Sequence, residues 1–572
     1  MKREDSDEDI SADVESGGLT RSLKRKGGQR VPANVQWNRP GPASLDELLA
    51  WPADYVSRLQ DIDAAVGLSI KEAPRQNLQR GVVLTTSYSG TGAIEHAMVM
   101  LASEFDRVAS ETSVSACRVV VHSACDCAPA AQKCLTAHTD CSRPRHVFAD
   151  LMDRLYPADR DILEAIRDDV LRKLQVLLSE ARKTKEYSSD SRRGRMAFSA
   201  GKKELGAEMR GRVLSALREM EFRPDAFCII HDRRCPLDPR AEDPSLAEYI
   251  HIEVAGNTCT PWAVSGSHGR WCSPCTLPVL VWACHCRYLG VDAVVNECTP
   301  LWEADVLDAE VFQDTAPEIP RYPLRSGSVK YSFESFCFNA TSMGIPASRH
   351  RRWSLWRRSG SMACGMHDVP FGEIFFRRLD CSCAVYLRAP ADVLKDDVMT
   401  RAMQLMGLSR EDLHPLGLTK AESVLPPGVL GRLRAWRAFA AERGVYQHST
   451  KDTAHSSIIV DLNQNVEWAA MGLDVCLPLL RGAEPYDLVS DRPLHILERL
   501  LLHGFPVPGL ADETFAKHFP FPSLLRDGGL TPGQLKSLTG NGMVLQVAGA
   551  VLLYLLSGGG GSGIAAPTSC SE

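Results

Sequence analysis

The sequence predicts an α/β fold in which helices cover both faces of a mostly parallel sheet. Short apolar runs rich in β-branched residues alternate with amphipathic helical patterns, and glycine or proline separates them. The 572 residues, 44% of them hydrophobic, suffice for a sizeable core and for about two to four domains, or for one large domain with insertions.

The expected strands come in order along the chain. The first ends at a Gly-rich turn, after which a helical pattern begins, and Pro129 opens the helix that follows the second. A later apolar run at 276–284 predicts a buried helix. The expected strands occupy residues 82–86, 118–123, 146–149, 249–255 and 291–295.

Shifts in composition divide the chain. Residues 1–40 form an expected disordered tail, acidic and then basic, whose basic cluster is either a nuclear-import signal or simply solvated. A main α/β domain spans 41–358 and is interrupted by a helical and basic insertion at 153–247. Residues 359–490 lack the alternating pattern and predict a smaller domain. The main domain resumes at 491–556, before a flexible Gly-rich tail at 557–572.

The insertion opens with an amphipathic helix and continues into an expected polar loop. The basic residues of that loop could contact phosphates or simply face solvent. They are Lys183, Lys185, Arg192, Arg193 and Arg195.

Charge and cysteine content limit the class of protein. The net charge of -6 excludes a polycation, so any nucleic-acid surface must be a local patch. We see no signal-peptide pattern and expect the 19 cysteines to be reduced thiols of an intracellular protein. The apolar run at 543–556 is shorter than the roughly 20 residues that span a bilayer, so we expect no membrane association.

Polar and glycine residues follow the first three strands. Ser89-Gly90-Thr91-Gly92 is a turn that exposes backbone to a ligand at a helix N-terminus. Asp126 could bind a ribose diol and Asp150 an adenine amino group, although each could equally cap a strand end. Glu95 stands where a phosphate-binding G-x-G-x-x-G motif has its third glycine, which favours S-adenosylmethionine over NAD.

Four later segments resemble motifs of the cytosine-C5 DNA methyltransferases. They are Gly256-Asn257-Thr258-Cys259 through Gly266, Asn296-Glu297-Cys298, Asn339 through Gly344-Ile345-Pro346 to Arg349-His350-Arg351, and Arg492-Pro493-Leu494 through Glu498 to Gly504-Phe505-Pro506. Gly540-Asn541-Gly542 is similar to a fifth motif, expected to open the last helix. The resemblance covers about residues 80–556 without the insertion.

The resemblance implies a Rossmann-like methyltransferase sheet, completed by a C-terminal helix beside the first strand, with 359–490 as the target-recognition domain. It implies that Cys259 attacks cytosine C6, Glu297 binds the N3 edge, Arg349 reaches O2 and Arg351 supports it, with the base flipped out of the duplex. It places S-adenosylmethionine against Tyr88, Ser89, Gly90, Thr91, Gly92, Asp126, Asp150 and Asn541.

The sequence also departs from the family pattern. Asn257-Thr258 replaces Pro-Pro, Thr260 replaces Gln, Cys298 replaces Asn and Ala347 replaces Gln. The attacking thiol, the acid and both arginines are kept, so these changes bear on rate and target choice more than on the class of reaction.

Two alternatives stay open: a tRNA or other RNA cytosine-C5 methyltransferase, and a catalytically silent scaffold that binds the cofactor or DNA. We expect DNA as the partner, with RNA as the alternative, and the nucleus as the location, with the cytoplasm as the alternative; the target site and protein partners are left open. Cys272-x-x-Cys275 and Cys284-x-Cys286 could suggest zinc, but we expect structural thiols there and at the other C-x-C pairs, and no metal.

Overall fold

The computed structural model describes most of the chain. The described residues are 39–66, 70–109, 116–183, 192–263, 266, 269–313, 330–364, 369–413, 421–446, 455–467 and 470–558. Both expected tails, except residues 39–40 and 557–558, lie outside these ranges, as does Lys185.

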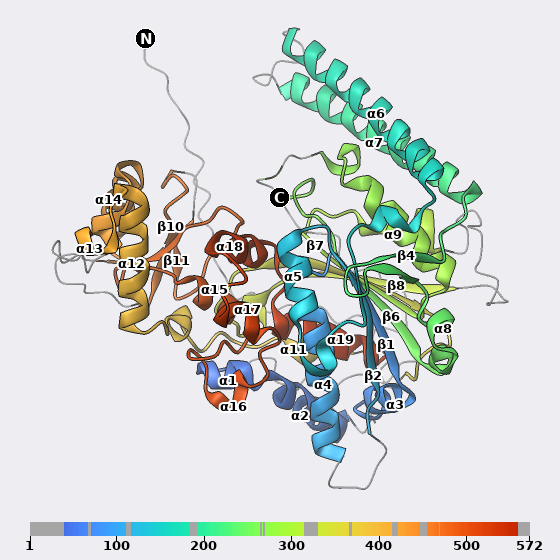
Figure 1. Ribbon diagram of the computed structural model, residues 1–572, viewed down its shortest axis with the longest axis horizontal. Coiled ribbons are helices and arrows are strands. Elements are labelled where there is room, and N and C mark those ends of the chain that lie inside the picture. Colours follow the sequence, from blue (N-terminus) through green and yellow to red (C-terminus); the bar gives the residue numbers. More distant parts are fainter. Residues whose placement is uncertain are drawn as a thin grey trace. The chain divides into compact units, whose positions relative to one another are not determined.

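A nine-stranded sheet in the order β5-β4-β3-β2-β1-β6-β7-β9-β8 organises the main domain (Figure 1). Its five parallel strands are β1 (Val82–Ser87), β2 (Val119–Cys125), β3 (His146–Phe148), β6 (Ile250–Gly256) and β7 (Ala293–Cys298). Antiparallel hairpins complete both edges: β4 (Asp225–Cys228) with β5 (Arg233–Pro236), and β8 (Tyr331–Asn339) with β9 (His350–Arg358).

Strand order places a switch point at the centre of this sheet. From β1 the chain moves outward through β2 and β3, and it then returns to the other side of β1 to form β6 and β7. Ligands of open α/β sheets bind where the order reverses, beyond the carboxyl ends of the strands. The doubly wound fold class is therefore confirmed, and it places the expected site at the ends of β1 and β6.

Helices cover both faces of the sheet. The side chains along a strand alternate between these two faces, so helices on both faces are needed to bury them. Val147 packs with Leu135 of α5 (Pro129–Ala137), whereas Phe148 packs into the core that includes α9 (Thr276–Leu289). Successive strand side chains point to opposite faces, so α5 and α9 lie on opposite faces. The C-terminal helix α19 (Leu545–Leu556) packs beside α4 (Ala93–Ala109), the helix that follows β1.

The expected insertion at 153–247 contains two long helices, α6 (Pro157–Lys183) and α7 (Arg192–Glu219), packed along each other (Figure 1), and it then continues into β4 and β5 of the main sheet. Arg192, Arg193 and Arg195 therefore begin a helix, and the prediction of a loop there was wrong. Val170 of α6 and Val213 and Leu217 of α7 are fully buried in the core that includes α9, because the two helices share an apolar stripe facing the sheet.

Residues 369–493 contain the remaining strands. A four-stranded antiparallel sheet, β11-β10-β12-β13, consists of β11 (Gly472–Leu473), β10 (Ile458–Asp461), β12 (Pro485–Asp487) and β13 (Arg492–Pro493). Trp436 of α14 (Pro427–Glu442) is fully buried against it with Ile458 and Tyr486. This sheet has a hydrophobic core of its own.

The C-terminal segment Pro532–Leu556 is long and apolar enough to cross a membrane, and its most apolar 18-residue stretch has a mean hydropathy of 1.5. It comprises α18 (Pro532–Asn541), a break at Gly542, and α19. In this most apolar stretch 94% is buried inside the protein, which is typical of a core helix.

Candidate active site

The turn after β1 depends on its two glycines. Gly90 and Gly92 have φ angles of +59° and +77°, in the left-handed region that disfavours side chains. A Cβ on Gly92 would lie 2.2 Å from the ring of His138, whereas one on Gly90 would meet nothing within 4 Å. The turn therefore packs tightly on its inner side and leaves its backbone open at Gly90.

Hydrogen bonds tie this turn to the second strand. Asp126 accepts from the backbone N–H of Gly90 at 2.9 Å and from that of Ala128 at 2.8 Å. The Ser89 hydroxyl accepts from the backbone N–H of Cys125 at 3.1 Å. Thr91 is buried, and its carbonyl lies 2.9 Å from His138 Nε2. Asp126 thus positions the turn as well as standing at the expected ribose position.

Asp150 is held by different partners. Its carboxylate caps a short 3₁₀ helix (Leu151–Arg154) by accepting from Met152 N at 3.0 Å, and it forms an ion pair with Arg160 of α6 at 3.2 Å. This is the strand-end cap that the sequence left open as an alternative.

Several expected cofactor residues meet in one small cavity. Tyr88, Ser89 and Gly90 line it from the turn, Gly256 lines it from the end of β6, and Asn541 faces them from the end of α18. The cavity measures about 20 Å³. The Tyr88 hydroxyl is buried without a hydrogen-bond partner. Gly540-Asn541-Gly542 ends α18 and precedes α19 rather than opening the last helix as expected.

Cys259 stands in the loop beyond β6, three residues after the strand ends. Its carbonyl accepts from the backbone N–H groups of Trp262 and Ala263, both at 2.9 Å, so the loop turns tightly behind the thiol. Register places this loop beside the next strand, because Gly256 pairs with Glu297 and the N–H of Asn257 donates to the Glu297 carbonyl at 3.0 Å.

Strand pairing also explains how Glu297 meets Arg351. Glu297 of β7 pairs with Trp353 of β9, and Arg351 lies two residues earlier on β9, hence on the same face. Arg351 Nε lies 2.9 Å from Glu297 Oε1, with only 15% and 7% of the two side chains exposed. Arg349, two residues before Arg351, lines a second small pocket together with Glu297 and Arg351.

Arg349 is a buried cation. Its residue is 8% exposed, and its Nε has no hydrogen-bond partner. The pKa of Arg349 is lowered to about 9, chiefly by burial and in smaller part by neighbouring Arg351, while Glu297 and Cys259 oppose the shift. Of the four expected catalytic residues, Glu297, Arg349 and Arg351 line one pocket, and the loop that carries Cys259 is hydrogen-bonded to Glu297 through Asn257.

Two neighbours of this pocket were not predicted. Burial, reinforced by Arg349, lowers the pKa of His503 to about 3, so this histidine is neutral, and its Nε2 has no partner. Asn257 is 4% exposed, and neither of its side-chain amide atoms is hydrogen-bonded. In the sequence, Asn257 could have been noticed because Asn257-Thr258 replaces the Pro-Pro of the family pattern. His503 could have been noticed only because it stands directly before Gly504-Phe505-Pro506.

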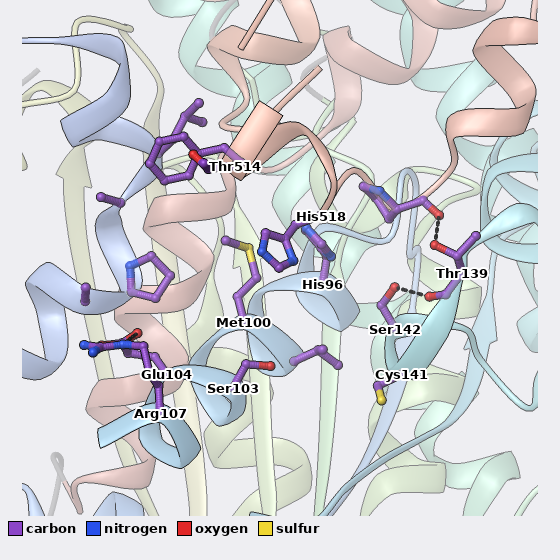
Figure 2. Close-up of a pocket in the computed structure, with 17 residues that line it drawn as sticks. His96, Met100, Ser103, Glu104, Arg107, Thr139, Cys141, Ser142, Thr514 and His518 are labelled. Carbon is purple, nitrogen blue, oxygen red and sulfur yellow. Dashed lines mark hydrogen bonds and ion pairs between the residues drawn. The ribbon is translucent and has the colours of Figure 1, made fainter. Parts of the chain in front are cut away.

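A separate and larger cavity of about 490 Å³ contains none of the expected site residues. Figure 2 shows His96, Met100 and Ser103 of α4 along one side, with Thr139 and Thr514 among the residues around it. Burial lowers the pKa of His96 to about 3, so its ring is neutral. This cavity has the size of a ligand pocket, and the two charged residues that line it, Glu104 and Arg107, form an ion pair with each other at 2.6 Å.

Comparison with known proteins gives remote matches. No protein-family model and no curated protein matches the sequence. Among solved structures, the chain is similar to the Dnmt2 methyltransferase of S. pombe (TM-score 0.36, 12% identity) and to the methyltransferase EhMeth of Entamoeba histolytica (TM-score 0.32, 12% identity). It is also similar to a putative DNA modification methyltransferase encoded within an E. coli prophage (TM-score 0.37, 11% identity). Each match covers 83% of this chain and 98% of the other, and all three proteins are named methyltransferases.

Proposed function

We propose that this protein transfers a methyl group from S-adenosylmethionine to C5 of cytosine in DNA. The observation that carries the proposal is the convergence of a thiol, a carboxylate and two arginines at the carboxyl ends of β6 and β7. Cys259, Glu297, Arg349 and Arg351 are the groups that the reaction needs. The pairing of β7 with β9 brings Glu297 to Arg351, and Arg349 lines the same pocket.

The residues around the Gly-rich turn fit an adenosyl ligand. Gly90 leaves its backbone open, Asp126 is half-buried beside it, and the Tyr88 hydroxyl has an unmet hydrogen bond. S-adenosylmethionine would supply an electrophilic methyl group there. The cavity of about 20 Å³ holds roughly one water molecule, so binding would require the segment of Asn541 and Met543 to shift away from the turn.

In the proposed reaction the Cys259 thiolate would add to cytosine C6, and the electron pair gained at C5 would form the bond to the methyl group as the C–S bond of the sulfonium breaks. Transfer of the C5 proton to water would then expel the thiolate and restore the ring. Glu297 Oε1 is held by Arg351, so its second oxygen serves the N3 edge, where charge develops. Arg349 would hold O2 with its guanidinium group, whose Nε is buried without a protein partner.

A covalent trap tests the nucleophile. DNA containing 5-fluorocytosine should give a denaturant-resistant band with the wild-type protein and cofactor, because fluorine cannot leave C5 as a cation. The band should vanish with Cys259→Ser or without cofactor. A band that survives in the serine variant refutes Cys259 as the nucleophile.

The same assay separates the alternatives. A band with fluorocytosine tRNA but not DNA would make RNA the substrate. If neither polymer is trapped while cofactor still binds, the protein is a catalytically silent scaffold, and the changes at Asn257, Thr258 and Thr260 account for its loss of activity.

Cofactor binding has its own test. Asp126→Ala should weaken S-adenosylmethionine binding in calorimetry while the protein stays folded. Asp243→Ala is the control, because Asp243, like Asp126, accepts from the backbone N–H two residues later, that of Ser245 at 3.0 Å, yet stands outside the proposed site. Unchanged affinity in Asp126→Ala would remove Asp126 from the site.

A further inference from the structure

Four potential metal ligands meet at the edge of the main sheet, away from the residues assigned above. Cys228 ends β4, Cys235 lies in β5, and His231 stands in the four-residue loop between these strands. His146 begins the neighbouring strand β3. One ligand atom from each lies within 4.8 Å of all the others.

Strand register explains the convergence. Cys228 pairs with Arg233, so Cys235, two residues further along β5, projects from the same face of the hairpin as Cys228. Both cysteines are buried. The hairpin reaches β3 through the pairing of Cys228 with Phe148 and through the N–H of Ile229, which donates to Val147 O at 2.8 Å.

We propose that Cys228, His231, Cys235 and His146 bind one zinc ion. The distances suit tetrahedral coordination. Both cysteine Sγ atoms lie 3.4 Å from His231 Nδ1. Ligands at about 2.3 Å for sulfur and about 2.0–2.1 Å for nitrogen, set at tetrahedral angles, are separated by about 3.5 Å.

Without an ion these groups are poorly satisfied. His231 Nδ1 carries either one proton or one lone pair, so it cannot make a good bond to two thiols at once. His146 is 2% exposed, and its Nδ1 has no hydrogen-bond partner. A cation bound to two thiolates would satisfy all four atoms together.

The opposite side of His146 is arranged as in metal sites. Its Nε2 lies 3.0 Å from a carboxylate oxygen of Glu242, which also lies 2.9 Å from His122 Nε2. A carboxylate that accepts from one ring nitrogen fixes the proton there and leaves the lone pair of the other nitrogen for the metal. Glu242 thus orients His146 Nδ1 toward the cysteines.

Four protein ligands leave no open position, so the ion would be structural rather than catalytic. It would fasten the β4–β5 hairpin, which follows the α6–α7 insertion, to β3. Phe148, the β3 residue paired with Cys228, lies two residues before Asp150. The zinc site would therefore stabilise the strand that leads to this candidate cofactor residue.

The first test uses the wild-type protein purified under reducing conditions. Elemental analysis should find one zinc per chain after dialysis against a weak chelator. X-ray absorption should find two sulfur ligands at about 2.3 Å and two nitrogen ligands at about 2.0–2.1 Å. Absence of zinc or a different ligand set would overturn the proposal. So would a Cys228–Cys235 disulfide, if mass spectrometry without alkylation finds one in protein purified under reducing conditions.

Variants then assign the ligands. His231→Ala, at an exposed loop position, should fold yet lose zinc, and Cys235→Ser should lose it too. Cys134→Ser is the matched control, because Cys134 is a buried free thiol of α5 outside the cluster, and it should keep one zinc. A His231→Ala protein that keeps one zinc with an unchanged absorption spectrum would refute the site. Methyl transfer plays no part in these readouts, so they stand whether or not the proposed reaction is correct.

Discussion

Replacing Arg349 by methionine separates a catalytic arginine from a structural one. A structural arginine stabilises the protein through its partners, whereas Arg349 is 8% exposed with an unpartnered Nε. Its backbone N–H donates to Asn339 Oδ1 at 2.7 Å, and this bond does not depend on the side chain. We therefore expect Arg349→Met to stabilise the fold and to abolish the reaction.

The size of the effect follows from burial. The pKa of Arg349 falls to about 9, and at about 1.4 kcal/mol per pKa unit the charged side chain is disfavoured by at most about 5 kcal/mol. Phe338, Trp353 and Val547 line the same pocket and would pack against methionine. Apolar replacement of buried charges has stabilised proteins by about 1–4 kcal/mol. We expect a gain in that range, and a loss of roughly 100-fold or more in adduct formation.

Urea unfolding at pH 7 without nucleic acid measures the first effect, and the fluorocytosine trap measures the second. Arg154→Met is the control, because Arg154 is equally buried but donates to Ser87 Oγ at 3.0 Å and lies 3.1 Å from His285 Nδ1; it should lower the free energy of unfolding. If Arg349→Met is destabilised by more than about 1 kcal/mol, Arg349 has a structural role and the reasoning fails.

Three further changes test the site and its support. Glu297→Gln should lower the single-turnover rate more than DNA affinity, because the charge it stabilises develops after thiol attack; equal losses would indicate a structural role. Gly90→Ala should lower the free energy of unfolding in urea by about 1–2 kcal/mol, because of its left-handed φ alone. Gly92→Ala should lower it clearly more, because the added methyl group meets the His138 ring. Similar losses in the two variants would contradict the packing described. Burial raises the pKa of Glu95 to about 7, so its contribution to stability is present below about pH 4.3 and is lost as the pH rises through 7. Glu95→Gln should flatten this fall in unfolding curves from pH 4 to 8, and an unchanged slope would show that Glu95 is not its source.

The parallel strands could be predicted because they are buried on both faces. The expected first strand, 82–86, differs from β1 by one residue, and the expected strand 291–295 begins two residues early. Such strands are continuous apolar runs that sequence shows directly. Edge strands escaped prediction because β4 and β5 are four residues long, and β8 is half-buried along almost all of its length.

The site divides in the same way. Motif order predicts Cys259, Glu297, Arg349 and Arg351 as site residues, because each follows a strand or turn with a recognisable pattern. The Glu297–Arg351 ion pair depends on antiparallel register, which the sequence does not display. The proposed zinc ligands were missed for a related reason: His146 stands 82 residues before Cys228, and only pairing of β3 with β4 brings them together.

The unpaired polar atoms around the thiol favour an enzyme over a silent scaffold. Arg349 Nε, His503 Nε2 and both amide atoms of Asn257 are buried without partners. Each such atom costs about 1–3 kcal/mol, and apolar side chains of similar shape would remove that cost. A scaffold that only binds cofactor has no use for these groups beside Cys259 and Glu297. A flipped base offers hydrogen-bonding atoms on its N3 edge and at O2, so unmet donors and acceptors at this position are what a base-binding pocket requires before its substrate arrives.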